Sequence, residues 1–107
     1  MANVLEVTDG NFQTEVVDSK IPVVVDFFAT WCGPCKVLSP VIEEVSKDYA
    51  GKVKVVKMDV DKSNETAVKF SIMSVPTVVF FKGGKEIGRN IGSVPKGVLE
   101  EQLAKVM

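Results

Sequence analysis

Histidine is absent from all 107 residues of the chain. This removes the side chain most often used as a catalytic base near neutral pH and the commonest metal ligand. The chain can therefore form neither a Ser–His nor a Cys–His nucleophile pair, nor a zinc site that contains histidine. It has only two cysteines, Cys32 and Cys35, so it lacks the disulfide framework of small secreted domains. These absences leave a narrow range of chemistry.

The chain also lacks an excess of charge and a long hydrophobic run. Its 13 basic and 14 acidic side chains give a net charge of -1, and we expect no nucleic acid or membrane surface as a partner. The longest apolar stretches, residues 21–25 and 78–81, are far shorter than the ~20 residues that span a bilayer. The first residues do not resemble a secretory signal. We therefore expect a soluble, cytoplasmic protein.

What is present is the composition of an ordinary globular protein, with 46% hydrophobic and 25% charged residues. The length fits one domain, and no internal repeat or linker-like segment divides the chain. Residues 1–107 are therefore predicted to form a single domain.

Apolar periodicity predicts an alternation of strands and helices. Strands are predicted at residues 3–7, 22–29, 53–58, 77–81 and 86–91, and helices at residues 9–19, 34–49, 61–70 and 96–106. Pro40 lies inside the second helix, where we expect a kink, and Ser63 or Asn64 is the expected cap of the third. A turn at residues 82–85, containing Gly83 and Gly84, favours an antiparallel pair of strands. The predicted fold class is α/β: a mixed sheet of about five strands flanked on both faces by about four helices.

Chemistry is concentrated in the segment WCGPC, residues 31–35, between a buried strand and a helix. The free N–H groups and the dipole of the helix start would stabilise Cys32 as a thiolate, which is the nucleophilic form. Pro34 suits the first helical turn because its missing N–H costs nothing there. Cys35 lies on the same helix face, so its attack on a mixed disulfide at Cys32 would be intramolecular.

Two other interpretations of the cysteine pair are weighed against redox chemistry. Buried structural cysteines fit poorly, because a helix start beside Trp31 is an unsuitable place to hide Cys32. A zinc site needs four Cys or His ligands, so this chain would need a dimer or outside ligands, and we expect no metal. A Cys-x-x-Cys segment between such a strand and helix favours a redox function.

The segment VVVDFFATWCGPCK, residues 23–36, resembles the active-site segment of the thioredoxin family. Further matches follow in order: Pro40, Asp59-Val60-Asp61, Val75-Pro76-Thr77, Phe81-Lys82-Gly83-Gly84 and Gly92. The resemblance covers the whole chain and implies a thioredoxin fold. It also implies a thiol–disulfide oxidoreductase that reduces disulfide-containing proteins, as a monomer without a bound cofactor, and that a separate thioredoxin reductase recharges.

Asp26 shares one face of its predicted strand with Val24 and Phe28, because side chains alternate along a strand. Burial among such neighbours disfavours the charged carboxylate and raises its pKa. Asp26 is therefore a candidate proton acceptor for Cys35, directly or through one water, unless it is a solvated residue of an irregular strand. By similarity to the family, Lys57 would lie near Asp26 and favour its ionised form; an exposed strand lysine fits the sequence equally well.

Pro76 would by default follow a trans bond and merely begin a strand. The resemblance implies instead a cis Val75–Pro76 bond opposite the dithiol, which would leave the Val75 backbone free to pair with an extended substrate. It also implies a shallow, mostly apolar rim formed by Trp31, Gly33, Ile72, Met73, Val75, Ile91, Gly92 and Ser93. Each apolar rim residue could instead belong to the ordinary core. Trp31 fits the core least well, because it falls in a turn.

Gly33 and Pro34 bear on the direction of the reaction. Disulfide isomerases and periplasmic oxidants that resemble this motif carry a cationic His between the cysteines; Gly33 and Pro34 add no charge, which predicts a more reducing couple. The sequence departs from the family pattern at Phe28, where many members have a second Trp, and at Ser74, where Gly is common. Neither departure removes a group that the reaction needs. The alternative to an enzyme is an interaction module that keeps the fold without turnover.

Overall fold

The computed structural model describes residues 4–107. Its strands are β1 (Leu5–Glu6), β2 (Val23–Phe28), β3 (Lys54–Asp59), β4 (Thr77–Lys82) and β5 (Lys85–Ile91). Its helices are the π-helical turn η1 (Gln13–Val17), α1 (Gly33–Asp48), α2 (Asn64–Lys69) and α3 (Lys96–Val106). Within the described residues, the predicted numbers of strands and helices are confirmed. Asn3, where the first predicted strand begins, lies outside them.

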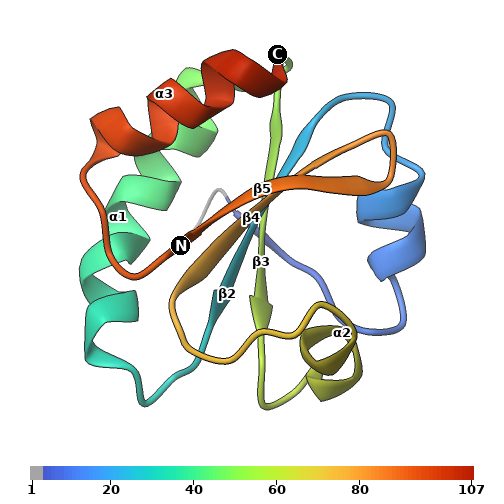
Figure 1. The fold of residues 1–107 in the computed structure, drawn as a ribbon, viewed down its shortest axis with the longest axis vertical. Coiled ribbons are helices and arrows are strands. Elements are labelled where there is room, and N and C mark those ends of the chain that lie inside the picture. Colours follow the sequence, from blue (N-terminus) through green and yellow to red (C-terminus); the bar gives the residue numbers. More distant parts are fainter. Residues whose placement is uncertain (1–3) are drawn as a thin grey trace.

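The five strands form one mixed sheet in the order β1-β3-β2-β4-β5. β3 runs parallel to both β1 and β2, whereas β4 is antiparallel to β2 and β5 is antiparallel to β4. β2 is therefore the central strand, which explains its nearly continuous apolar sequence, because a strand covered on both faces needs apolar side chains on both. Its carboxyl end leads directly into α1 (Figure 1).

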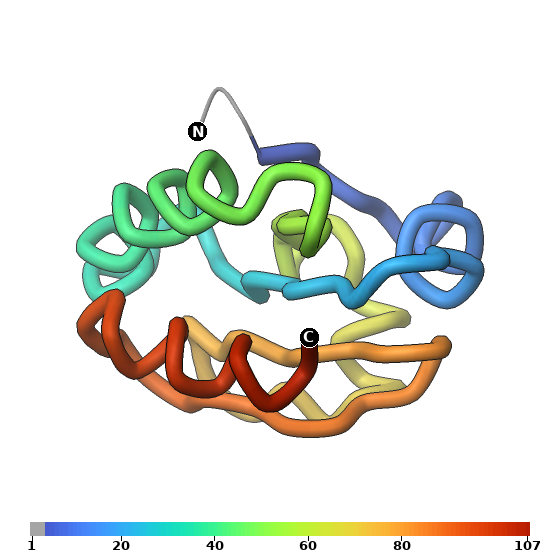
Figure 2. Tube along the Cα trace, turned by 90° about the horizontal axis from the view of Figure 1, so that it is seen from above, coloured from blue at the N-terminus to red at the C-terminus, as the bar shows by residue number. Residues whose placement is uncertain are grey.

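Helices cover both faces of the sheet, as predicted. α1 and α3 lie together on one side, and η1 and α2 lie on the other (Figures 1 and 2). Leu38 and Ile42 of α1 and Leu99 of α3 pack against Val24 and Phe80 of the sheet. The opposite cluster contains the neighbouring strand residues, among them Val25, Phe27, Val79 and Phe81. This alternation between the two layers is the period-two pattern of a strand.

Two predicted helices are shorter in the structure. The helix predicted at residues 9–19 is reduced to η1, whose Asp18 N–H donates to the Gln13 carbonyl at 2.9 Å. The helix predicted at residues 61–70 spans only Asn64–Lys69. Asp9, predicted to lie at the start of the first of these helices, instead contacts α2: its Oδ1 accepts from the backbone N–H of Thr66 at 2.9 Å and from the Thr66 hydroxyl at 2.6 Å. Asp9 therefore caps α2 rather than a helix of its own, and Ser63 precedes α2 without a side-chain cap.

The predicted turn between β4 and β5 is present, reduced to Gly83 and Gly84 because Lys82 and Lys85 belong to the strands. Both glycines have positive φ angles, 61° and 80°. A Cβ atom on Gly84 would stand 3.0 Å from Val17 Cγ1 and 3.1 Å from the Val17 carbonyl oxygen. Gly84 therefore allows the hairpin to approach η1 closely. Pro40 lies inside α1, and the kink expected there stays a prediction.

Candidate active site

Cys32 and Cys35 lie at the start of α1, joined by a disulfide with their Cα atoms 5.3 Å apart. Cys32 occupies the N-cap position, and its Sγ accepts from the backbone N–H of Cys35 at 3.2 Å. The Cys32 N–H in turn donates to the Ala29 carbonyl at 3.2 Å, which fixes the turn between β2 and α1. The two residues are only 4% and 5% exposed, so the oxidised pair is more buried than its place at a helix start suggests.

The first turn of α1 favours negative charge on Cys32. The free N–H groups of a helix start and the positive end of its dipole both point toward the N-cap. The first turn contains a proline and carries no acidic side chain that would oppose this field. Gly33 and Pro34, between the cysteines, likewise add no charge of their own. The position can therefore hold a thiolate at Cys32 once the disulfide is reduced.

The loop before β4 faces the disulfide. Cys32 Sγ lies 3.6 Å from the carbonyl oxygen of Val75, and the Val75–Pro76 peptide bond is cis, as the family resemblance implies. Pro76 is buried, and its carbonyl accepts from the N–H of Gly92 at 2.8 Å. The structure thus brings Val75, Pro76 and Gly92 together beside Cys32, although they come from two separate segments.

A shallow groove of about 140 Å³ lies next to the dithiol. Its lining is mostly apolar and consists of Trp31, Val60, Ile72, Met73, Ser74 and Val75. Trp31 is 69% exposed and Met73 is 91% exposed, so neither is ordinary core. Ile91 is also exposed, at the end of β5 opposite Thr77, but it does not line this groove. Of the residues predicted for the rim, Trp31, Ile72, Met73 and Val75 therefore share one surface.

Trp31 is held in place by a residue to which sequence analysis gave no role. Its indole Nε1–H donates to Asp61 Oδ2 at 2.9 Å. Asp61 follows the end of β3, and the carboxylate of Asp59 accepts from its backbone N–H at 2.9 Å, which fixes the turn. The two partners are separated by 30 positions, so no local pattern could have shown the contact.

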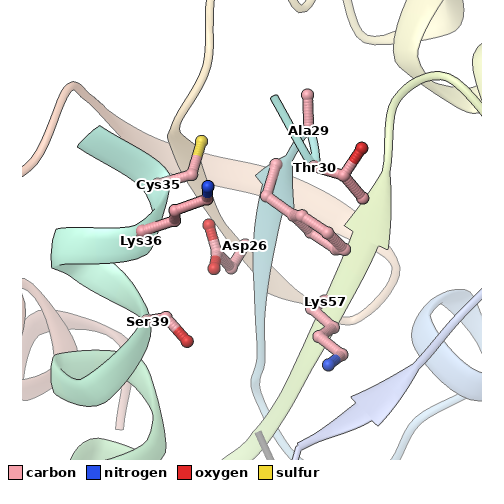
Figure 3. A pocket seen from close by; sticks show the side chains of 8 residues that line it. Asp26, Ala29, Thr30, Cys35, Lys36, Ser39 and Lys57 are labelled. Carbon is pink, nitrogen blue, oxygen red and sulfur yellow. The ribbon is translucent and has the colours of Figure 1, made fainter. Parts of the chain in front are cut away.

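Asp26 is buried below the disulfide, on the face of β2 that carries Val24, as predicted. Its side chain is 1% exposed, and its Oδ1 has no hydrogen-bond partner within residues 4–107. Figure 3 shows the carboxylate facing α1, between Cys35 and Ser39. Burial raises the pKa of Asp26 to about 7, and the positive charge of Lys57 opposes this rise. A group that titrates near neutral pH can both accept and release a proton.

Lys57 lies opposite Asp26 in the parallel pairing of β2 and β3. Within the described residues Asp26 forms no ion pair, so Lys57 acts on it through the electric field rather than by contact. The Lys57 Nζ stands 5.8 Å from the centre of the Phe28 ring, and both residues line the same cavity as Asp26. Lys57 therefore lies on the strand next to Asp26, and its role in the reaction stays a prediction.

A cavity of about 260 Å³ connects these groups. Its lining contains Asp26, Phe28, Ala29, Thr30, Cys35, Lys36, Ser39 and Lys57 (Figure 3). Sequence analysis did not single out Lys36 or Ser39. A usable signal existed for Ser39, because residues four apart on a helix lie on the same face, and Ser39 is four positions after Cys35.

No helix within residues 4–107 is long and apolar enough to cross a membrane. In the same range, no group of three or more His, Cys, Asp or Glu side chains is arranged to hold a metal ion.

Comparison with known proteins identifies the family. The family model described as Thioredoxin matches residues 3–105. "Thioredoxin 1" of Nostoc sp. is 45% identical over 105 residues, 98% of each chain, and "Thioredoxin" of Synechocystis sp. is 46% identical over 102 residues, 95% of each. "Thioredoxin" of Alicyclobacillus acidocaldarius is 48% identical over 103 residues, 96% of this chain and 97% of the relative. This chain belongs to the thioredoxin family and is a thiol–disulfide oxidoreductase whose redox centre is the Cys32–Cys35 pair.

Proposed function

We propose that the protein reduces disulfides of other proteins, with Cys32 as the attacking thiolate and Cys35 as the resolving thiol. The observation that carries this assignment is the place of the Cys32 sulfur, which accepts the Cys35 N–H at the start of α1. A sulfur at this position is stabilised as the anion. With its Cα atom 5.3 Å from that of Cys32, Cys35 can attack without leaving its helix turn.

The reaction proceeds in two exchanges. Cys32 attacks one sulfur of the substrate disulfide, which forms a mixed disulfide and releases the other substrate sulfur as a thiolate. Cys35 then loses its proton and attacks Cys32, so that the Cys32–Cys35 bond forms and the second substrate sulfur leaves. Asp26 is the proton acceptor for Cys35, supported by its burial and by a pKa of about 7. Lys57 supports the ionised carboxylate.

The groove beside the dithiol is the proposed docking surface for substrate. An extended substrate segment would pair with the backbone of Val75, and its side chains would contact the apolar surface of Trp31 and Ile72. Pro76 has no N–H to offer, which discourages pairing in another register. Ile91 and Gly92 extend the rim; the hydrogen bond from Gly92 to the Pro76 carbonyl supports this placement. Such a small surface accepts many protein disulfides.

The direction of the reaction is proposed to be reduction. Neither Gly33 nor Pro34 adds a charge that would over-stabilise the thiolate, so the dithiol gives up its electrons more readily. Members of the thioredoxin family act on disulfide-containing proteins and are themselves reduced by a reductase. We propose the same for this chain, acting in the cytoplasm as a monomer of one domain without a bound cofactor.

Insulin reduction in the presence of dithiothreitol tests this function. The wild-type protein should accelerate precipitation of the insulin chains, and Cys32→Ser should abolish the acceleration. Mixed with insulin without dithiothreitol, reduced Cys35→Ser should instead accumulate a stable mixed disulfide, because no resolving thiol is present. If the wild type gives no acceleration, or if Cys32→Ser retains it, the enzyme assignment is wrong and a non-enzymatic interaction module is favoured.

A further inference from the structure

Ser39 lies where it can act on the proton that Cys35 must lose. It follows Cys35 by four residues on α1, so both side chains lie on the same helix face. Both line the cavity of about 260 Å³ that also contains Asp26. Figure 3 shows Asp26 between the two, with the Ser39 hydroxyl turned toward the side of the helix that faces β2.

The Asp26 carboxyl contains a buried oxygen without a hydrogen-bond partner in the described part of the chain, and Ser39 lies close enough to help satisfy it through water. This oxygen, Oδ1, is buried and has no hydrogen-bond partner among residues 4–107. A buried polar atom without a partner is costly. The cavity is large enough for a water molecule, which is retained where two to four polar groups contact it. Asp26 Oδ1, the Ser39 hydroxyl and the Cys35 thiol supply such groups from two facing elements.

The other polar groups around Asp26 are less suited to this role. Lys57 approaches from β3 and Lys36 from α1, and an ammonium group can only donate hydrogen bonds. Val78, the partner of Asp26 on β4, carries no polar side chain. The Thr30 hydroxyl points away from Asp26 in Figure 3. A serine hydroxyl both donates and accepts, so it can hold a water in either protonation state of the carboxyl.

We propose that Ser39 is a positioning residue for proton transfer: its hydroxyl and the Asp26 carboxylate hold one water molecule that carries the proton from Cys35. This inference rests on the proposed roles of Asp26 and Cys35. In the mixed disulfide, the Cys35 thiol gives its proton to the water, and the water gives one of its own to Asp26 Oδ1. The Cys35 thiolate then forms the bond to Cys32, and the substrate sulfur leaves with the electron pair of the broken bond.

The two exchanges can be followed separately with the aromatic disulfide DTNB, used in excess over the reduced protein. Attack by Cys32 releases one coloured thiolate in a phase whose rate depends on concentration; resolution by Cys35 releases the second in a phase that does not. Ser39→Ala should leave the first phase unchanged and slow the second about three- to tenfold at neutral pH, the equivalent of one lost hydrogen bond. Alanine is the best helix former, so α1 should remain intact.

Three comparisons make the test specific. Ser39→Thr restores the hydroxyl and should recover most of the rate, whereas Thr30→Val removes a hydroxyl from the same cavity and should have no effect. The rate of Ser39→Ala should also approach that of the wild type at alkaline pH, where hydroxide removes the Cys35 proton without help from Asp26. A helix defect would not depend on pH in this way.

The inference is overturned if Ser39→Ala follows the wild type at every pH, or if Thr30→Val slows the second phase equally. A different result would overturn the proposed function beneath it. If Asp26→Asn does not slow the second phase, or if the wild type shows no such phase, the assigned roles of Asp26 and Cys35 are wrong whatever Ser39 does.

Discussion

Asp26 on β2 and Lys57 on β3 occupy paired positions of one parallel ladder, yet only the lysine reaches solvent. The Asp26 carboxyl is 1% exposed, and burial raises its pKa to about 7 against the opposing charge of Lys57. The sheet thus places an ionisable group under the dithiol and tunes it with a cation from the next strand. Burial of Asp26 is therefore costly to the fold, whereas its proposed role is in proton transfer, and the two effects can be measured separately.

Replacement of the buried carboxyl should stabilise the protein in a pH-dependent way. The pKa of Asp26 is about 7 in the folded state and about 4 in the unfolded chain. Between these values the folded state holds the extra proton, so the free energy of unfolding of the wild type falls as pH rises from ~4 to ~7 and then levels off. Asp26→Asn should match the wild type near pH 4 and exceed it by up to about 4 kcal/mol at pH 8.

Urea denaturation of the oxidised proteins at both pH values measures this gap. The same variant is expected to lose activity: in the DTNB assay, Asp26→Asn should slow the second phase, which is the attack by Cys35. An advantage of the same size at pH 4 and pH 8 would show that the carboxyl is not the source.

Loss of the Lys57 charge should raise the pKa of Asp26 further. Lys57→Met keeps the length of the side chain and removes the positive charge that favours the carboxylate. A rise of a few tenths to about one pKa unit is expected for a charge at the edge of a buried site. Titration of the Asp26 carboxyl carbon by NMR measures it directly. Lys54→Met is the matched control on the same strand, because Lys54 pairs with Glu15 instead, at 2.6 Å; an equal rise there would refute the assignment to Lys57.

The hydrogen bond between Trp31 and Asp61 should restrain the Trp31 side chain in the proposed docking surface. Asp61→Leu removes the acceptor of the indole N–H, whereas Asp61→Asn keeps an oxygen at the same place. Because Trp31 is the only tryptophan, the fluorescence anisotropy of the protein reports on the mobility of this one side chain. We expect lower anisotropy and an insulin reduction rate lowered about two- to tenfold for Asp61→Leu, with little change for Asp61→Asn. Unchanged anisotropy in Asp61→Leu would show that the contact does not restrain Trp31.

The cap that Asp9 supplies to α2 should contribute measurably to stability. Asp9→Ala leaves the N–H of Thr66 without its acceptor, and loss of such a cap costs about 1–2 kcal/mol. The hydrogen bonds from Thr66 lower the pKa of Asp9, so the contribution is present at neutral pH and is lost as pH falls through that lowered pKa. Urea denaturation at pH 7 measures it. Asp18→Ala, which loses only an exposed contact with Gln13, is the control and should cost less than ~0.5 kcal/mol; an equal loss in both variants would argue against the cap.

The sheet and the dithiol could be predicted from the sequence, because both are determined by residues that are close together in the chain. The β-branched run around Val24 and Val25 specifies a strand that is buried on both faces, and the alternation along it predicted that Asp26 shares a face with Val24. The two cysteines needed only their spacing and the helix start to be recognised. The catalytic roles of Asp26 and Lys57 stay predictions, which the variants above test.

Contacts between distant segments were missed because nothing local marks them. Asp9 and Thr66 are 57 positions apart, and the hydrogen bond between them caps α2 and not the helix predicted at residues 9–19. The bond between Trp31 and Asp61 likewise depends on how β3 ends beside the start of α1. These contacts follow from the assembled sheet, so sequence periodicity alone does not contain them.

In the proposed reaction, Cys32 is held as a thiolate at the start of α1, and Cys35 reacts only in the second exchange. Alkylation of the reduced protein by iodoacetamide, followed from pH 5 to pH 10 by mass spectrometry of both cysteine peptides, tests it most directly. We expect Cys32 to be labelled well before Cys35, and its labelling rate to reach half of its maximum at least one pH unit below the ~8.5 of an ordinary thiol. Labelling of Cys32 with the pH dependence of free cysteine, or preferential labelling of Cys35, would show that Cys32 is not the activated nucleophile.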